Sequence, residues 1–242
     1  MSERITSRKN QRIVDAAKYC GHPGDKFLVE GFHTVEMALQ GGLVEAIFSL
    51  QEYPSPSVPL YLVTPEIIEK LSYTRNPEGI VALCHKKKGK PLQSSRVLFL
   101  DDIQDPGNIG TLLRTALAFG FRDVILTKKC CDPYNPKALL AGQGALFLLN
   151  LLLEADGLEE VEALKKQGYY VVGTSLDRAV SLTDFAMPKK KIALILGNEG
   201  QGVRKEILAK TDINIKIPIA SIDSLNVGVA GGILMHALAL IK

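Results

Sequence analysis

The chain has 242 residues, of which 46% are hydrophobic and 23% charged, and its formal net charge is +3 at pH 7. This length fits one large or two modest domains with folded cores, and the mild positive charge permits nucleic acid binding without indicating it. The most apolar run, residues 145–153, is too short to span a bilayer, and no apolar stretch of a signal peptide follows the basic start, so we expect a cytoplasmic protein without a membrane partner.

The cysteines and histidines do not suggest a metal site. The four cysteines show no ligand spacing, and two of them, Cys130 and Cys131, are direct neighbours and therefore poor disulfide partners. The four histidines are scattered along the chain. We expect reduced thiols and no metal ion.

The first 85 residues have the pattern of a small α/β domain. A basic amphipathic segment comes first, and solvation explains such a segment more often than RNA does. Strands and helices of similar length then alternate, which is typical of a compact α/β unit. The expected strands are 26–29, 44–49, 60–63 and 80–84, and the expected helices are 32–40 and 65–71. His33 could touch RNA, but a partly buried histidine at a helix start is the favoured interpretation.

Residues 86–95, KKKGKPLQSS, are polar, lysine-rich and interrupted by Gly89 and Pro91. This composition is typical of a linker. Its lysines could follow a phosphate backbone, although a solvated charge run is the default.

From residue 96 onward, apolar strands alternate with helices, which predicts a parallel sheet covered by helices on both faces. The expected strands are 96–100, 123–126, 169–174, 192–196 and 213–217, with a short apolar segment near 148–152. The expected helices are 109–119, one from Lys137, 158–166, 204–210 and 227–240.

Three polar, glycine-containing stretches interrupt this pattern: DPGNIGTLLRTALAFG (105–120), LILGNEGQGV (194–203) and SLNVGVAGG (224–232). The second has the spacing GxxGxG, not the GxGxxG of a dinucleotide-binding turn, and no P-loop sequence exists, so an oxidoreductase or nucleotide hydrolase lacks its fingerprint. Thr174, Gly197 and Ile217 end or follow predicted strands, and ligands of such sheets bind beyond the strand carboxyl ends. The three residues therefore predict one ligand crevice.

In this order, the three stretches resemble the motifs of the SpoU (TrmH) family of SPOUT methyltransferases. Upstream, ITSRKNQ and FLVEGFHTVEMAL (27–39) resemble the small substrate-binding domain that often precedes the catalytic one. The resemblance implies an L30-like RNA substrate-binding domain over 1–85, a linker over 86–95 and a SPOUT domain with a deep trefoil knot over 96–242. It also implies methyl transfer from S-adenosylmethionine to a ribose 2′-hydroxyl of RNA.

The resemblance further implies which residues hold the methyl donor. The crevice takes S-adenosylmethionine largely through backbone groups. The matching positions are Thr174, Leu196, Gly197, Asn198, Gly202, Ile217, Leu225 and Asn226.

The catalytic positions carried over are Asn108, Arg114, Glu199, Ser224 and Asn226. We expect Asn108 at the cap of a helix and Arg114 two turns inside it. The family assigns the matching arginine to activating the hydroxyl, but a guanidinium with a pKa above about 12 is an awkward base, and clamping a phosphate is the alternative. Loop and cap hydrogen bonding is the alternative role for Ser224.

The sequence departs from the family at three positions. Leu140 and Gly142 stand where members often have an arginine and a serine or threonine, and Gly228 replaces a frequent serine or alanine. The RNA substrate is therefore open: ribosomal RNA is favoured by the N-terminal domain, with transfer RNA methylation or a non-catalytic RNA-binding protein on the same fold as alternatives.

The last helix is apolar over more than one stripe. Its apolar residues are Val229, Ile233, Leu234, Ala237, Leu238 and Leu240, with Gly231 and Gly232 small enough for close helix packing. Either the chain itself or a second subunit must cover this surface. The resemblance favours a homodimer.

Overall fold

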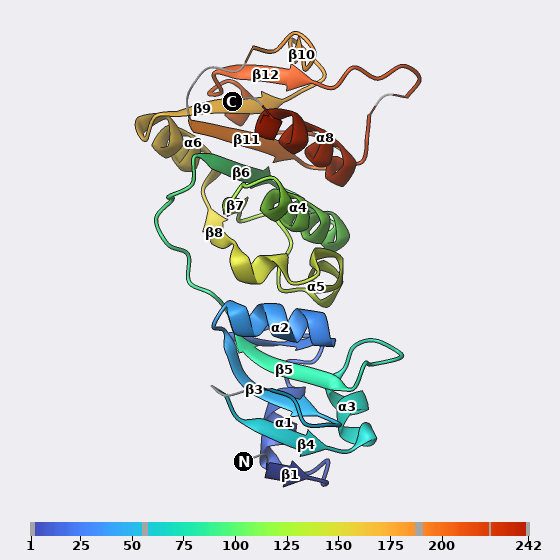
Figure 1. Cartoon of the computed structure of the whole chain (residues 1–242). Coiled ribbons are helices and arrows are strands. Elements are labelled where there is room, and N and C mark those ends of the chain that lie inside the picture. Colours follow the sequence, from blue (N-terminus) through green and yellow to red (C-terminus); the bar gives the residue numbers. More distant parts are fainter. Residues whose placement is uncertain (1–2, 55–57, 187–190, 223, 241–242) are drawn as a thin grey trace. The chain divides into compact units, whose positions relative to one another are not determined.

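The computed structural model describes residues 3–54, 58–186, 191–222 and 224–240 (Figure 1). Its contacts divide the chain into two compact units. The first, called the N-terminal unit, consists of residues 1–87 and 133–148. The second, called the catalytic unit, consists of residues 88–132 and 149–242.

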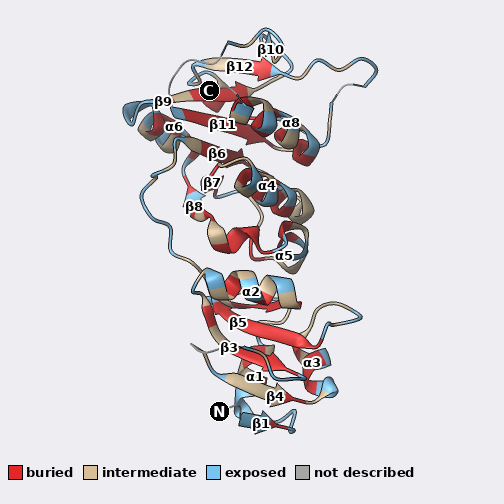
Figure 2. Cartoon of the chain, viewed as in Figure 1, coloured by how far each residue is buried: buried red, intermediate tan, exposed pale blue. Residues whose placement is uncertain are grey.

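The N-terminal unit contains a five-stranded mixed sheet with the order β1-β4-β3-β5-β2. Its strands are β1 (Glu3–Ile5), β2 (Lys26–Glu30), β3 (Val44–Ser49), β4 (Leu60–Val63) and β5 (Ile80–His85). Its helices are α1 (Gln11–Ala17), α2 (Phe32–Gln40), α3 (Pro65–Leu71), α5 (Pro136–Gly142) and the 3₁₀ helix η1 (Ala145–Leu148). Figure 2 shows buried residues concentrated along β3 and β5, at the centre of this sheet. The predicted α/β unit is confirmed, with β1 as an edge strand that the sequence did not predict.

Helices cover both faces of this sheet, and one of the covers comes from a distant part of the sequence. α1 and α3 bury Ile13, Ile67 and Ile68 against one face. On the opposite face, α2 packs against η1, and Phe27 of β2 lies with its ring centroid 4.6 Å from that of Tyr134 and 6.1 Å from that of Phe147. Residues 133–148, which the sequence placed in the catalytic domain, therefore complete the core of the N-terminal unit.

The segment 86–95, expected to be a linker, is held by hydrogen bonds along its length. The Lys87 N–H donates to the Tyr134 hydroxyl, within the N-terminal unit, at 3.1 Å. Further on, the Lys90 N–H donates to Asn150 Oδ1 at 2.8 Å, and the backbone N–H groups of residues 93 and 94 both donate to the Asp123 carboxylate. The second half of the segment therefore runs along the catalytic unit beside β8, the edge strand of its sheet, and covers that edge.

The catalytic unit contains a seven-stranded sheet with the order β10-β12-β9-β11-β6-β7-β8, in which every pair is parallel. Its strands are β6 (Arg96–Asp101), β7 (Asp123–Thr127), β8 (Asn150–Ala155), β9 (Tyr169–Thr174), β10 (Val180–Ser181), β11 (Lys191–Gly197) and β12 (Ile213–Lys216). Its helices are α4 (Pro106–Ala118), α6 (Gly157–Lys166), α7 (Lys205–Leu208) and α8 (Val227–Leu240). The predicted parallel sheet is confirmed.

Helices cover both faces of this second sheet, as expected. α6 and α7 bury Val161, Leu164 and Ile207 against one face. α4 and α8 lie together on the other face, where they run parallel (Figure 1). A Cβ at Gly231 would overlap Leu112 of α4, so the glycine permits the close approach of the two helices.

Several predicted element ends differ from the structure. The helix expected from Ile109 begins at Pro106, the helix expected to reach Lys210 ends at Leu208, and the last strand stops one residue before Ile217. The apolar segment near 148–152 divides between η1 and β8. The two-residue strand β10 carried no sequence signal. The trefoil knot stays a prediction of the resemblance.

No helix within residues 3–54, 58–186, 191–222 and 224–240 has the length and apolar content needed to cross a membrane.

Candidate active site

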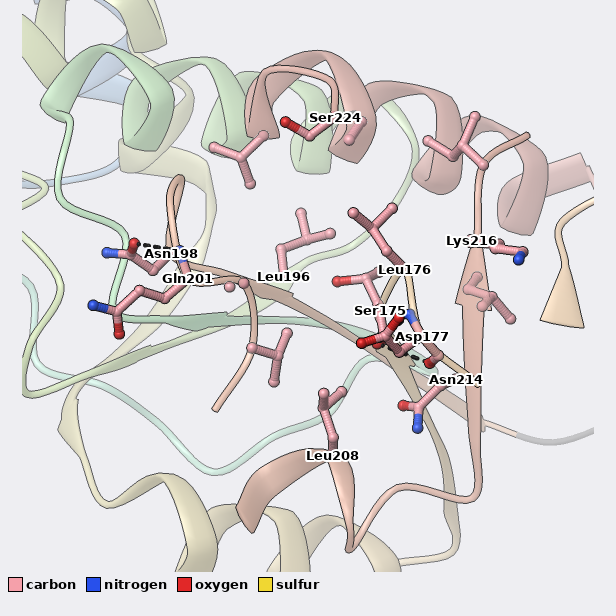
Figure 3. A pocket seen from close by; sticks show the side chains of 18 of the residues that line it. Ser175, Leu176, Asp177, Leu196, Asn198, Gln201, Leu208, Asn214, Lys216 and Ser224 are labelled. Atoms are coloured by element: carbon pink, nitrogen blue, oxygen red, sulfur yellow. Dashed lines mark hydrogen bonds between the residues drawn. The ribbon is translucent and has the colours of Figure 1, made fainter. Parts of the chain in front are cut away.

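The carboxyl ends of β9, β11 and β12 surround an open pocket of about 950 Å³ in the catalytic unit. Its wall combines the loop after β9 (residues 175–178), the loop after β11 (residues 198–203) and the segment leading into α8. Figure 3 shows Asn198 and Gln201 on one side of the pocket, Ser175 and Asp177 on the opposite side, and Leu196 between them. This is the edge of the sheet at which ligands of parallel α/β folds bind.

Seven of the eight positions expected to hold the methyl donor line this pocket. They are Thr174, Leu196, Gly197, Asn198, Gly202, Ile217 and Leu225. The eighth, Asn226, is not among the lining residues. The pocket has the volume of a small-molecule site, and its lining mixes aliphatic side chains with loop backbone. Apart from Gly202 itself and its two chain neighbours, no atom of the described residues lies within 4 Å of where a Cβ of Gly202 would stand, so a ligand can approach this backbone closely. These residues fit a nucleoside-containing donor.

Gly197 is required by the protein's own backbone. A Cβ at this position would overlap the Val203 N and the carbonyl carbon of Gly202. The loop after β11 folds back over Gly197, and its first residue, Asn198, accepts hydrogen bonds at Oδ1 from the backbone N–H groups of Gly200 (2.9 Å) and Gln201 (3.1 Å). We expected Gly197 to be a glycine because a ligand approaches its backbone. The structure shows that the close approach of the loop backbone already requires a glycine here.

Three of the predicted catalytic residues form a continuous chain of hydrogen bonds. Asn108 Nδ2 donates to Glu199 Oε1 at 2.9 Å, and Asn226 Nδ2 donates to Asn108 Oδ1 at 3.0 Å. Asn108 is separated from Glu199 by 91 positions and from Asn226 by 118 positions in the sequence. Strand order and the parallel packing of α4 and α8 therefore bring together the polar residue of each predicted motif.

Helix capping differs from the prediction for Asn108. The N-cap of α4 is Asp105, whose side chain accepts a hydrogen bond from the Asn108 N–H at 3.0 Å, and Pro106 occupies the first helical turn. Asn108 lies inside the first turn instead of at the cap. Its side-chain amide is thereby free of a capping role and bonds to Glu199 and Asn226.

Asn226, not Ser224, holds the start of α8. Asn226 Oδ1 accepts from the backbone N–H groups of Gly228 (2.8 Å) and Val229 (3.2 Å), which is the geometry of an N-cap. Ser224 is exposed and lines the pocket, and within the described part of the chain its hydroxyl has no hydrogen-bond partner. Its hydroxyl is available to a ligand.

Glu199 is held as a carboxylate. Partial burial raises the pKa of Glu199, but hydrogen bonds from the Asn108 side chain and from the backbone N–H groups of Asp105 and Gln104 outweigh burial. The pKa of Glu199 therefore lies below its usual value. At neutral pH this side chain accepts hydrogen bonds and cannot donate a proton.

Arg114 lies on α4, six positions after Asn108, and its side chain is exposed. Across residues 3–54, 58–186, 191–222 and 224–240, it makes no ion pair or hydrogen bond. It does not join the hydrogen-bond chain around Glu199.

Two charged residues near the site were missed by sequence reasoning. Asp101 ends β6 and is fully buried, and its carboxylate accepts from Arg204 Nη2 at 2.7 Å and Nε at 3.0 Å. This hydrogen bonding raises the pKa of Arg204. A signal was present, because Asp101 follows a run of buried apolar residues in LFLDD and a buried charge needs a partner.

The cysteines and the acidic groups of the described ranges form no metal site. Among the residues that the structure describes, no group of three or more His, Cys, Asp or Glu is placed to hold a metal ion. All four cysteines are free thiols, and burial raises the pKa of Cys130 and raises that of Cys131 to about 12.

The parallel sheet, the pocket at its carboxyl edge and the polar chain beside it define an α/β methyltransferase of the SPOUT class. Residues 95–236 match the model of the SpoU rRNA Methylase family, and residues 23–82 match that of the MRM3-like substrate binding domain. The chain belongs to the SpoU rRNA methylase family.

Relatives cover the whole chain. It is 35% identical to the 23S rRNA (guanosine(2553)-2′-O)-methyltransferase RlmP of Bacillus subtilis, over 98% of this chain and 99% of that protein. It is 32% identical to an uncharacterized tRNA/rRNA methyltransferase of Synechocystis, over 96% of this chain and 92% of the relative. The crystal structure of an AdoMet-bound rRNA methyltransferase from Sinorhizobium meliloti superposes with a TM-score of 0.86 at 25% identity, covering 100% and 99% of the two chains.

Proposed function

We propose that this protein transfers a methyl group from S-adenosylmethionine to a ribose 2′-hydroxyl of ribosomal RNA. The observation that carries the proposal is the hydrogen-bonded chain of Glu199, Asn108 and Asn226 beside a donor-sized pocket. Full-length similarity to a ribosomal RNA 2′-O-methyltransferase favours ribosomal over transfer RNA. A ribosomal RNA substrate supports a cytoplasmic location, which is part of the proposal.

The bound donor supplies an electrophilic sulfonium methyl group. The residues of this chain hold and orient the two reactants, which accounts for much of the acceleration in a displacement of this kind. Thr174, Gly197 and Ile217 offer backbone groups along the pocket wall. Glu199 and Asn226 are fixed through Asn108, so their positions require no rearrangement when RNA arrives.

Arg114 is the proposed contact for the substrate backbone. It is exposed, and no carboxylate in the described part of the chain competes for it. Its guanidinium stays protonated at any physiological pH, which suits it to clamping the phosphate beside the target ribose and stabilising charge near the hydroxyl.

The N-terminal unit is the proposed RNA-docking domain, in keeping with its match to a substrate-binding family. Arg12 stacks over the Tyr61 ring at 5.2 Å and donates to the Tyr61 hydroxyl at 3.1 Å. A guanidinium held against an aromatic ring offers both charge and a stacking surface to RNA. Arg4, Arg8 and Lys9, also exposed, add to the positive charge near the N-terminus.

A homodimer through α8 is part of the proposal. Leu234 and Leu238 of α8 are buried within the catalytic unit, whereas Val229 is 53%, Ile233 39% and Leu240 67% exposed. The three exposed residues fall on one stripe of the helix. An apolar stripe of this kind is typical of a surface that a second subunit covers.

Mapping of 2′-O-methyl groups in total RNA from cells with and without the protein tests the proposal. We expect the loss of a modification in ribosomal RNA and its return with the wild-type chain but not with the Arg114→Ala variant. Loss confined to transfer RNA would support the alternative substrate. An unchanged methylation map, together with no donor binding by calorimetry, would leave a non-catalytic RNA-binding protein.

A further inference from the structure

Asp101 and Arg204 form an ion pair that the methyl-transfer chemistry does not explain. Asp101 has no exposed surface and is not among the pocket-lining residues. Its carboxylate accepts from Arg204 Nε (3.0 and 3.1 Å), from Arg204 Nη2 (2.7 Å) and from the Arg204 backbone N–H (3.1 Å). A buried carboxylate with this many charge-assisted bonds is fixed in place.

The pair closes the loop that carries Glu199. Gly197, at the end of β11, lies opposite Asp101 in the register of β11 and β6. The loop 198–203 leaves from this point and returns to the Asp101 carboxylate through Arg204. Both ends of the loop are thereby attached to one residue of β6.

We propose that Asp101 and Arg204 are positioning residues that hold the 198–203 loop so that Glu199 meets Asn108. The inference rests on the proposed function, because Glu199 and the loop backbone are assigned there to methyl transfer. The guanidinium acts through its fork of two donors, and an ammonium group cannot reproduce that geometry.

The neighbouring helix is shaped to leave room for this guanidinium. A Cβ at Gly157, the first residue of α6, would overlap Arg204 Nη2 and stand 2.8 Å from Ile207 Cδ1. The backbone of Gly157 does not require glycine, because its φ is not positive. Gly157→Ala therefore displaces the Arg204 side chain without changing a charge, and alanine itself favours the helix.

Hydrogen exchange of the ligand-free protein is the first test. The N–H groups of Gly200, Gln201 and Gly202 all donate to Asn198, so their exchange reports the closed loop. We expect Arg204→Lys and Gly157→Ala to accelerate exchange across 198–203 at least tenfold, with β7 and β8 unchanged. The control is Lys165→Met on α6, which removes the ion pair between Lys165 and Asp212 (2.9 Å). We expect it to leave exchange across 198–203 unchanged.

A double-mutant cycle with Glu199→Gln is the second test. If the pair acts through Glu199, Arg204→Lys lowers kcat about tenfold in the wild type but less than twofold in the Glu199→Gln background. Equal losses in both backgrounds, or loop exchange that does not accelerate, would overturn the inference. If the wild type methylates no RNA, the proposed function fails, and the exchange measurement still decides whether the pair holds the loop.

Discussion

Replacing Phe147 with alanine tests the division of the chain into two units. Phe147 is 1% exposed and its ring is stacked on that of Phe27, at 14° between the planes. Truncating a buried phenylalanine in a well-packed core costs about 3–5 kcal/mol. Phe147 follows the first methyltransferase motif in the sequence, yet its contacts belong to the N-terminal unit. The loss of stability should therefore appear in that unit.

Native-state hydrogen exchange locates the loss. A destabilisation of about 3 kcal/mol, at 1.4 kcal/mol per factor of ten, accelerates exchange through opening of the unit by about 100-fold. We expect this acceleration in β2 and β5, with β6 and β11 unchanged. Leu164→Ala is the matched control, because Leu164 of α6 is fully buried in the core of the catalytic unit and should produce the reverse pattern. Unchanged protection of β2 and β5 in Phe147→Ala would refute the assignment of residues 133–148.

The other predictions concern the site and the dimer. Arg114→Ala should lower kcat by two or more orders of magnitude with little change in donor affinity by calorimetry, since the loss falls on the transition state. Gly197→Val should lower both the donor affinity and the Tm, because its side chain meets the loop backbone before any ligand. The pKa of Glu199 is depressed in the folded state, so its stabilising bonds are complete above the unfolded value of about 4.3 and disappear as the pH falls through the folded value. The Tm difference between wild type and Glu199→Gln should thus be constant from about pH 7 to 5 and shrink below about pH 4.5. Ile233→Glu should give a folded monomer by light scattering, and a wild-type chain that is already monomeric at micromolar concentration would contradict the dimer.

Local patterns in the sequence predicted the strands and the meeting of the motifs. The strand-end rule placed Thr174, Gly197 and Ile217 around one crevice because each ends or follows a predicted strand, and all three line the pocket. The same rule does not give side-chain contacts. That Asn108 bonds to both Glu199 and Asn226 depends on the parallel packing of α4 and α8, which no local pattern encodes.

The sequence at the start of α4 contains a clear capping signal. Asp105 followed by Pro106 is the usual signature of an N-cap and a first helical residue. Asp105 is therefore a better N-cap candidate than Asn108. No comparable local signal marks the position of residues 133–148 in the fold. Tyr134 and Phe147 are not part of a periodic pattern that would assign them to one sheet or the other. Their partner Phe27 is more than a hundred residues away in the sequence.

The position of α5 in the N-terminal unit bears on the two departures from the family pattern at Leu140 and Gly142. Leu140 and Gly142 lie on α5, within the segment that packs with the N-terminal unit. Glu199, Asn108 and Asn226 belong to the catalytic unit, and their hydrogen bonds involve neither position. Replacement of the usual polar residues on α5 therefore leaves the arrangement beside the donor pocket intact. Leu140 is exposed on α5 and Gly142 is buried there, within the unit that contains the substrate-binding match, so we expect the two replacements to affect the choice of RNA and not the capacity to transfer a methyl group.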